Sequence, residues 1–241
     1  MKNKILMLTI LAVLLAYVVA AFAYSSSVRS NGLVRDVRVE LLDTVADVSV
    51  SDIGAFLKAR DVILSGKQYS GIDYDSLERL VETHPLVKRA ECYLSADDDV
   101  VIRVVQRVPV ARVFADSGDT YFIGDEAERI TCMEGISPYV PVLSGDLTYE
   151  FVRDTLFDLV TRVRDDDFWR AQVEQIYVAP NRDITLIPRV GQMDIKLGKA
   201  ESLQTKLDNL KLFYKEAPQQ VGWNKYKSIN AEFENQIIAE K

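Results

Sequence analysis

The sequence predicts an α+β protein in which a single N-terminal transmembrane helix precedes two small folded domains. Three observations support this fold class: a long charge-free run near the N-terminus, a β-α-α-β-β pattern after it, and a second half in which short strands accompany two amphipathic helices. Length and composition agree, because 241 residues with 48% hydrophobic and 27% charged side chains suit a globular chain of one or two domains.

The charge-free run extends from Ile5 to Tyr24, and Lys2 and Lys4 precede it. As a helix it would be about 30 Å long, which matches the hydrocarbon core of a bilayer. The lysines favour a cytoplasmic N-terminus by the positive-inside rule, so we expect a single-pass anchor in the inner membrane with the rest of the chain in the periplasm. The expected borders are a cytoplasmic tail at residues 1–4, the transmembrane helix at residues 5–24 and a linker at residues 25–32.

A cleaved signal peptide is the alternative, since Ala21-Phe22-Ala23 has the small-x-small pattern that signal peptidase prefers. Either alternative exports the remaining chain. The net charge of −7 argues against a nucleic-acid partner, which would require a basic surface. A single histidine and two cysteines argue against the usual zinc sites, so we expect neither a metal nor a cofactor.

Residues 33–108 are predicted to form the first domain. Its clearest helix runs from Asp73 to His84, with Asp73 as the capping residue and an apolar stripe on one face, and Pro85 ends it. A three-stranded sheet with two helices on one face would bury these apolar positions. The other expected elements are a strand over Val37–Leu41, a helix after Ser51-Asp52, and strands over Val87–Leu94 and Val100–Val108. The expected core positions are Leu80, Val87, Ile102 and Val104.

Residues 109–241 are predicted to form a second domain, with an antiparallel sheet and helices on one of its faces. Apolar residues at helical spacing predict one helix from Thr148 to Arg164 and another from Lys199 to Ala217. The expected strands are Val173–Ala179, Ile184–Ile187, Met193–Leu197, Lys225–Ala231 and Phe233–Ala239.

The side chains that could carry chemistry have simpler interpretations. His84 has no cysteine or second histidine near it in the sequence, so we interpret it as a partly exposed residue at a helix end. The acidic runs Asp97–Asp99 and Asp165–Asp167 lack the ligand spacing of a calcium loop and are expected to be solvated. Cys92 alternates with apolar residues and is expected to be a small buried side chain. We therefore expect no catalytic residue and no metal ligand.

Several segments carry a family resemblance. His84-Pro85-Leu86-Val87-Lys88-Arg89-Ala90 leads into the second strand of the first domain, and Gln106-Arg107-Val108-Pro109-Val110-Ala111-Arg112 leads out of its third. With Val140-Pro141-Val142-Leu143-Ser144-Gly145 further on, the chain resembles the bacterial cell-division family FtsQ (DivIB), which combines a POTRA domain with a β-domain. The short N-terminal tail and the altered closing strand are similar to the Bacteroides-type branch of that family.

The resemblance implies a non-enzymatic scaffold of the divisome that acts at the division septum. Such a protein would link FtsL-like and FtsB/DivIC-like partners to the FtsW/FtsI complex, which synthesises septal peptidoglycan. Two alternatives remain open: an exported POTRA-containing protein of outer-membrane assembly or secretion, and a periplasmic hydrolase.

The candidate partner-binding site lies near the end of the chain. Phe233–Ala239 reads as a strand with no later strand to cover it, so it is expected to be a sheet edge to which an extended partner segment can add. Tyr226, an aromatic residue close by, is a candidate anchor for a partner. In the family that the chain resembles, FtsB docks on the corresponding strand. The resemblance assigns this role to Phe233, Asn235, Gln236, Ile237 and Ile238.

Overall fold

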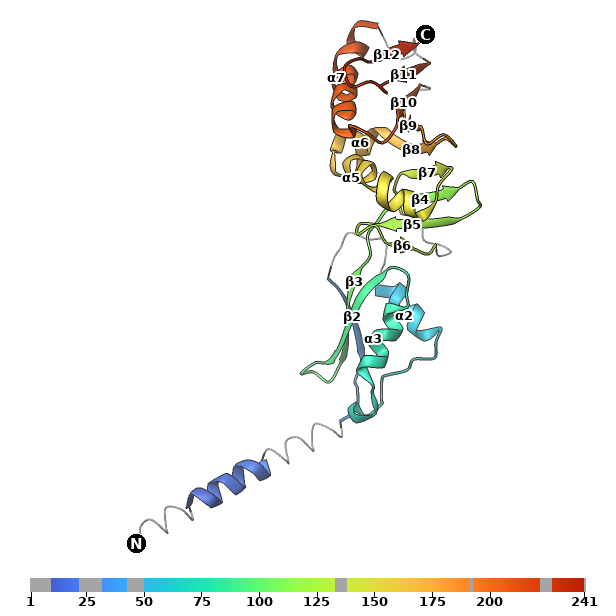
Figure 1. Cartoon of the computed structure of the whole chain (residues 1–241). Helices are drawn as coiled ribbons and strands as arrows, with labels where there is room; N and C mark the ends of the chain where they lie inside the picture. Colours follow the sequence, from blue (N-terminus) through green and yellow to red (C-terminus); the bar gives the residue numbers. More distant parts are fainter. Residues whose placement is uncertain are drawn as a thin grey trace. The chain divides into compact units, whose positions relative to one another are not determined.

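The computed structural model describes residues 10–21, 32–42, 50–132, 138–190, 193–221 and 227–240 (Figure 1). The chain divides into two compact units, of which the first ends at Gln106 and the second begins at Arg107. Among the described residues, each unit has its own sheet, with three strands in the first and nine in the second.

The transmembrane helix expected at the N-terminus is wrong. The helix that the structure describes there covers residues 10–21, which corresponds to about 18 Å of helix against a hydrocarbon core of about 30 Å. Among all described residues, no helix combines the length and the apolar character that a membrane crossing requires. The other parts of the expected span, residues 5–9 and 22–24, lie outside the described residues.

The first unit has the expected β-α-α-β-β order. Its elements are β1 (Val37–Leu41), α2 (Val50–Lys58), a 3-10 turn η1 (Tyr69–Gly71), α3 (Tyr74–Glu82), β2 (Val87–Leu94) and β3 (Val100–Gln106). The strand order is β1-β3-β2, with β3 parallel to β1 and antiparallel to β2. Figure 1 shows α2 and α3 on the same side of the strands, as the apolar pattern predicted.

Helix α3 begins and packs largely as its sequence predicted. The side chain of Asp73 accepts a hydrogen bond from the backbone N of Ser76 at 3.0 Å and so caps the helix. Leu77 and Val81, four residues apart, are buried. Leu80 is only half-buried, so its expected place in the core is wrong: the buried stripe of the helix runs along the other two residues. The buried positions that were predicted correctly are Val87, Ile102 and Val104.

The second unit is built on the nine-stranded sheet, whose order is β12-β11-β10-β9-β8-β7-β4-β5-β6. Its strands are β4 (Pro109–Ala115), β5 (Thr120–Gly124), β6 (Arg129–Ile130), β7 (Val142–Gly145), β8 (Val173–Val178), β9 (Ile184–Pro188), β10 (Asp194–Gly198), β11 (Ser228–Asn230) and β12 (Ile238–Glu240). Its helical segments are α4 (Tyr149–Phe151), the π-helical turn η2 (Val152–Leu156), α5 (Phe157–Asp165), α6 (Asp167–Gln172) and α7 (Leu203–Val221).

The sheet of the second unit is mixed, so the expected antiparallel arrangement is wrong. Strand β7 runs parallel to both β4 and β8, and β10 runs parallel to β11. Parallel neighbours need a crossover that returns the chain to the starting end of the sheet. The segments α4 to α6 provide this crossover between β7 and β8, and α7 provides it between β10 and β11.

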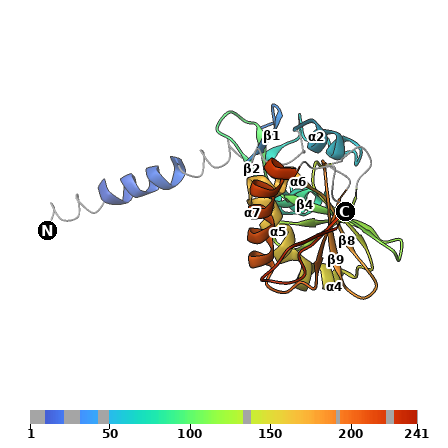
Figure 2. The ribbon, with the colours of Figure 1, turned by 90° about the horizontal axis from the view of Figure 1, so that it is seen from above.

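The helices cover one side of this sheet, as expected. Figures 1 and 2 both show α5, α6 and α7 along the same side of the strands. Leu159 and Val163 of α5 and Leu207 of α7 belong to one continuous core with the inward residues of the strands. Burial of apolar side chains between the two layers therefore holds the second unit together.

Candidate functional site

Strand β12 forms one end of the nine-stranded sheet. It pairs in antiparallel register with β11, so that Ile229 faces Ala239 and Asn230 faces Ile238. The described residues place no strand on its other side. The backbone N–H and C=O groups along that outer side therefore lack a strand partner within the described chain, which is the geometry that strand addition requires.

Glu240 connects the end of β12 with the neighbouring strands β11 and β10. Its carboxylate accepts a hydrogen bond from Ser228 Oγ on β11, and Lys196 Nζ on β10 lies 3.6 Å from it. The hydrogen bond from Ser228, and then the charge of Lys196, hold the pKa of Glu240 below its usual range. The backbone N of Lys227 also donates to the carbonyl O of Glu240 at 2.8 Å. The edge is thus held in place although the strand is short.

The closing strand β12 (Ile238–Glu240) is shorter than the expected Phe233–Ala239. Side chains form hydrogen bonds with the backbone of the residues that precede it. Asn230 Oδ1 accepts a hydrogen bond from the backbone N of Glu232 at 2.9 Å, which ends β11. Asn209 Nδ2, on α7, donates to the carbonyl O of Glu234 at 2.6 Å. The segment between β11 and β12 is therefore held beside α7, and strand pairing resumes at Ile238.

The structure gathers the described partner-binding candidates in one continuous surface segment. Phe233 is 50% exposed and Ile238 is 43% exposed, and the polar candidates Asn235 and Gln236 are exposed as well. Ile237 is half-buried and packs on the core of the second unit. Tyr226 lies outside the described residues.

A shallow hollow of about 440 Å³ lies between this segment and α7. Its walls come from Asn235, Gln236 and Ile237 on one side and from Asn209 and Leu212 on the other. Leu212 is 53% exposed, so the hollow offers apolar surface next to the strand edge. Sequence reasoning missed the residues of α7 and those that fasten Glu240, because no local pattern connects them with the closing strand.

The described residues offer binding surfaces but no grouping that suggests catalysis. They contain no cluster of three or more His, Cys, Asp or Glu side chains placed to hold a metal ion. Cys92 is buried, as expected, and burial raises the pKa of its thiol to about 12, so the thiolate nucleophile is suppressed.

The expectation for His84 is wrong, because its side chain is 1% exposed. It packs edge-to-face on Phe56, with 5.0 Å between the ring centroids. Its Nδ1 accepts a hydrogen bond from the backbone N of Leu86 at 3.3 Å. His84 is thus a core residue of the first unit.

Comparison with protein families identifies both units. A family model described as FtsQ/DivIB, C-terminal related, matches residues 108–240, and a model described as a POTRA-like domain matches residues 34–105. No curated protein matches the chain. The first match covers more than half of the chain, and it contains β4 to β12 with the edge described above.

Proposed function

Because this chain belongs to the FtsQ/DivIB family, as its sequence predicted, we propose that it is a non-enzymatic scaffold that links FtsL-like and FtsB/DivIC-like partners to the FtsW/FtsI complex at the division septum. Family membership supports the general role of a cell-division scaffold, and the POTRA-like domain match agrees with it.

The observation that carries the proposal is the outer side of β12, on which the described part of the chain places no strand. An extended segment of the FtsB-like partner adds there as a further strand, and backbone hydrogen bonds supply affinity that depends little on sequence. Selectivity comes from the exposed side chains beside the edge, with Ile238 on the strand and Phe233 before it.

The same edge is protected against unspecific pairing. Strand β12 has only three residues, and the charged side chain of Glu240 lies at its end. Short strands and charged residues are the usual means by which proteins prevent sheet edges from aggregating. A cognate partner supplies a matching strand for this short edge and also contacts the hollow beside α7.

Capture of the FtsB-like protein from the same organism by the purified full chain tests the proposal. Ile238→Arg places a charge on the proposed contact and should abolish capture. Ile63→Arg is the matched control, because Ile63 is 68% exposed, belongs to the first unit and undergoes the same chemical change. Circular dichroism verifies that both variants fold. Equal capture by the two variants would show that the partner does not bind at β12.

A further inference from the structure

An apolar groove lies in the same unit, far along the sheet from β12. It has a volume of about 370 Å³ and lies among the start of β4, the residues before β7, the corner between α5 and α6, and the end of β9. Strand β4 is six positions from β12 in the sheet, or about 29 Å at the usual strand spacing. The floor of the groove is formed by Pro109, Val110, Val140, Pro141, Val163 and Val173.

The rim of this groove is basic, although the whole chain carries a net charge of −7. Arg164, Arg170 and Arg189 line it, together with one carboxylate, that of Asp167. Asp165, which pairs with Arg164 next to the groove, adds a second negative charge, so three positive and two negative charges leave a local excess of one positive charge. The groove therefore attracts carboxylates, although the chain as a whole is negatively charged.

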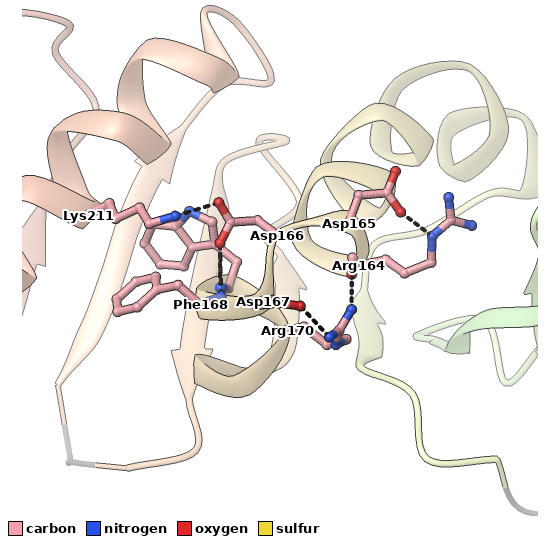
Figure 3. Close-up of polar contacts among 8 residues, drawn as sticks. Arg164, Asp165, Asp166, Asp167, Phe168, Arg170 and Lys211 are labelled. Atoms are coloured by element: carbon pink, nitrogen blue, oxygen red, sulfur yellow. Dashed lines mark hydrogen bonds and ion pairs between the residues drawn. The ribbon is translucent and has the colours of Figure 1, made fainter.

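The corner between α5 and α6 places two of these arginines. Asp166 follows α5 in an extended conformation and caps α6 by accepting a hydrogen bond from the backbone N of Phe168 at 2.9 Å (Figure 3). Lys211 Nζ on α7 lies 2.6 Å from the same carboxylate and fixes the corner from the other side. Arg170 Nη1 then donates to the carbonyl O of Arg164 at 3.1 Å, which brings the two arginines together.

Arg164 and Arg170 each form an ion pair with an aspartate that a ligand carboxylate can replace. Arg164 Nε lies 2.7 Å from the carboxylate of Asp165, and Arg170 contacts that of Asp167. The side chain of Asp167 is 91% exposed. Such solvated ion pairs contribute little free energy, so exchange for a ligand carboxylate costs little.

Arg189 is different, because the described residues place no carboxylate beside it. Its guanidinium stacks on the ring of Tyr139 at 4.5 Å and donates a hydrogen bond to the Tyr139 hydroxyl. Its Nε atom is buried and has no acceptor among the described residues. Tyr139 itself is 84% exposed. An arginine that is charged, stacked and without an acidic partner is suited to bind a carboxylate.

We propose that this groove binds an extended acidic segment of a partner protein. Its carboxylates pair with Arg189, Arg164 and Arg170, and an apolar side chain of the same segment lies on the floor. Tyrosine and arginine are the side chains that most often dominate binding energy at protein interfaces. The apolar floor favours a peptide over a purely anionic polymer, which has no apolar group to bury. This surface is separate from β12 and does not depend on the function proposed above.

Fluorescence anisotropy with the purified full chain tests the proposal. The probe is a short fluorescein-labelled peptide of alternating glutamate and leucine, and the matched control peptide has glutamine in place of glutamate. Loss of the charge-assisted contacts should weaken binding of the control peptide about tenfold or more. Added salt should weaken binding of the acidic peptide, because the contacts are partly exposed. Equal affinities for the two peptides would overturn the proposal.

Variants then locate the binding site. Arg189→Gln and Arg170→Gln should each weaken the acidic peptide about tenfold. Arg153→Gln is the control, since it removes the same charge from an arginine that pairs with Asp154 outside the groove. This variant should bind the acidic peptide with unchanged affinity. The Arg170 side chain is 60% exposed, and circular dichroism verifies that this variant folds. Unchanged affinity in both groove variants would overturn the proposal.

Vesicles of phosphatidylglycerol provide the last comparison. If the groove variants lost binding to vesicles while their affinity for the acidic peptide stayed the same, the arginines would contact an anionic membrane surface and the proposal would be wrong. Capture of the FtsB-like partner through β12 is measured separately, so failure of either proposal leaves the other intact.

Discussion

Leu210 tests whether the packing of α7 stabilises the second unit. Its side chain is fully buried in the core of that unit. Replacement by alanine removes three carbon atoms, which corresponds to about 2.4 kcal/mol of transfer free energy at about 0.8 kcal/mol per methylene. The cavity that remains adds roughly 1 to 2 kcal/mol. We expect the free energy of unfolding of Leu210→Ala to fall by about 3.4 to 4.4 kcal/mol.

Thermal unfolding of the full chain, followed by circular dichroism, measures this loss. A unit of about 135 residues has an unfolding entropy of about 0.28 kcal/mol per degree, so its Tm should fall by about 12 to 16 °C. Leu212→Ala is the control on the same helix, because Leu212 is 53% exposed and its loss should cost less than about 0.5 kcal/mol. Equal melting temperatures for the two variants would refute the assigned buried face of α7.

Two further predictions concern His84 in the first unit and Gly145 in the second. Burial lowers the pKa of His84 in the folded first unit. As the pH falls below about 6.5, the unfolded chain therefore binds a proton at His84 more readily than the folded chain does, and the first unit should lose stability. His84 is the one histidine of the chain, so its NMR titration is unambiguous, and a midpoint at or above about 6.5 would contradict this burial effect. Gly145 has a φ of +106°, and a Cβ there would lie 2.0 Å from the carbonyl O of Val178. Gly145→Ala should therefore destabilise the second unit by more than about 1 kcal/mol in urea unfolding, whereas Gly118→Ala, which also has a positive φ but open space around it, should cost less.

The sequence alone predicted the family, and it predicted a closing strand over Phe233–Ala239, of which only Ile238 and Ala239 belong to β12. Alternating apolar residues predicted β1, β2 and β3, and the aspartate at position 73 predicted the start of α3. These features are local, because strand and helix periods and caps are written in neighbouring residues. The bounds of the closing strand were wrong, because Asn209 on α7 binds the backbone of Glu234 and this contact joins residues far apart in the sequence.

The charge-free run predicted a membrane helix, whereas the described helix at residues 10–21 is too short for one. Hydropathy shows where the chain is apolar but does not define how far a helix extends. The predicted strand direction in the second unit was also wrong, since direction depends on the end of the sheet to which each connection returns the chain. The sequence locates the helices, and their packing decides that β10 and β11 are parallel.

Tertiary structure alone assembles the surfaces that bear on function. The basic groove combines Arg164, Arg170 and Arg189 with Tyr139, which come from separate parts of the chain, so no spacing in the sequence connects them. The outer side of β12 is likewise defined by the order of nine strands. Local patterns determine which segments become helices and strands, because they depend on neighbours in the chain. Sites depend on neighbours in space, and those exist only once the core has packed.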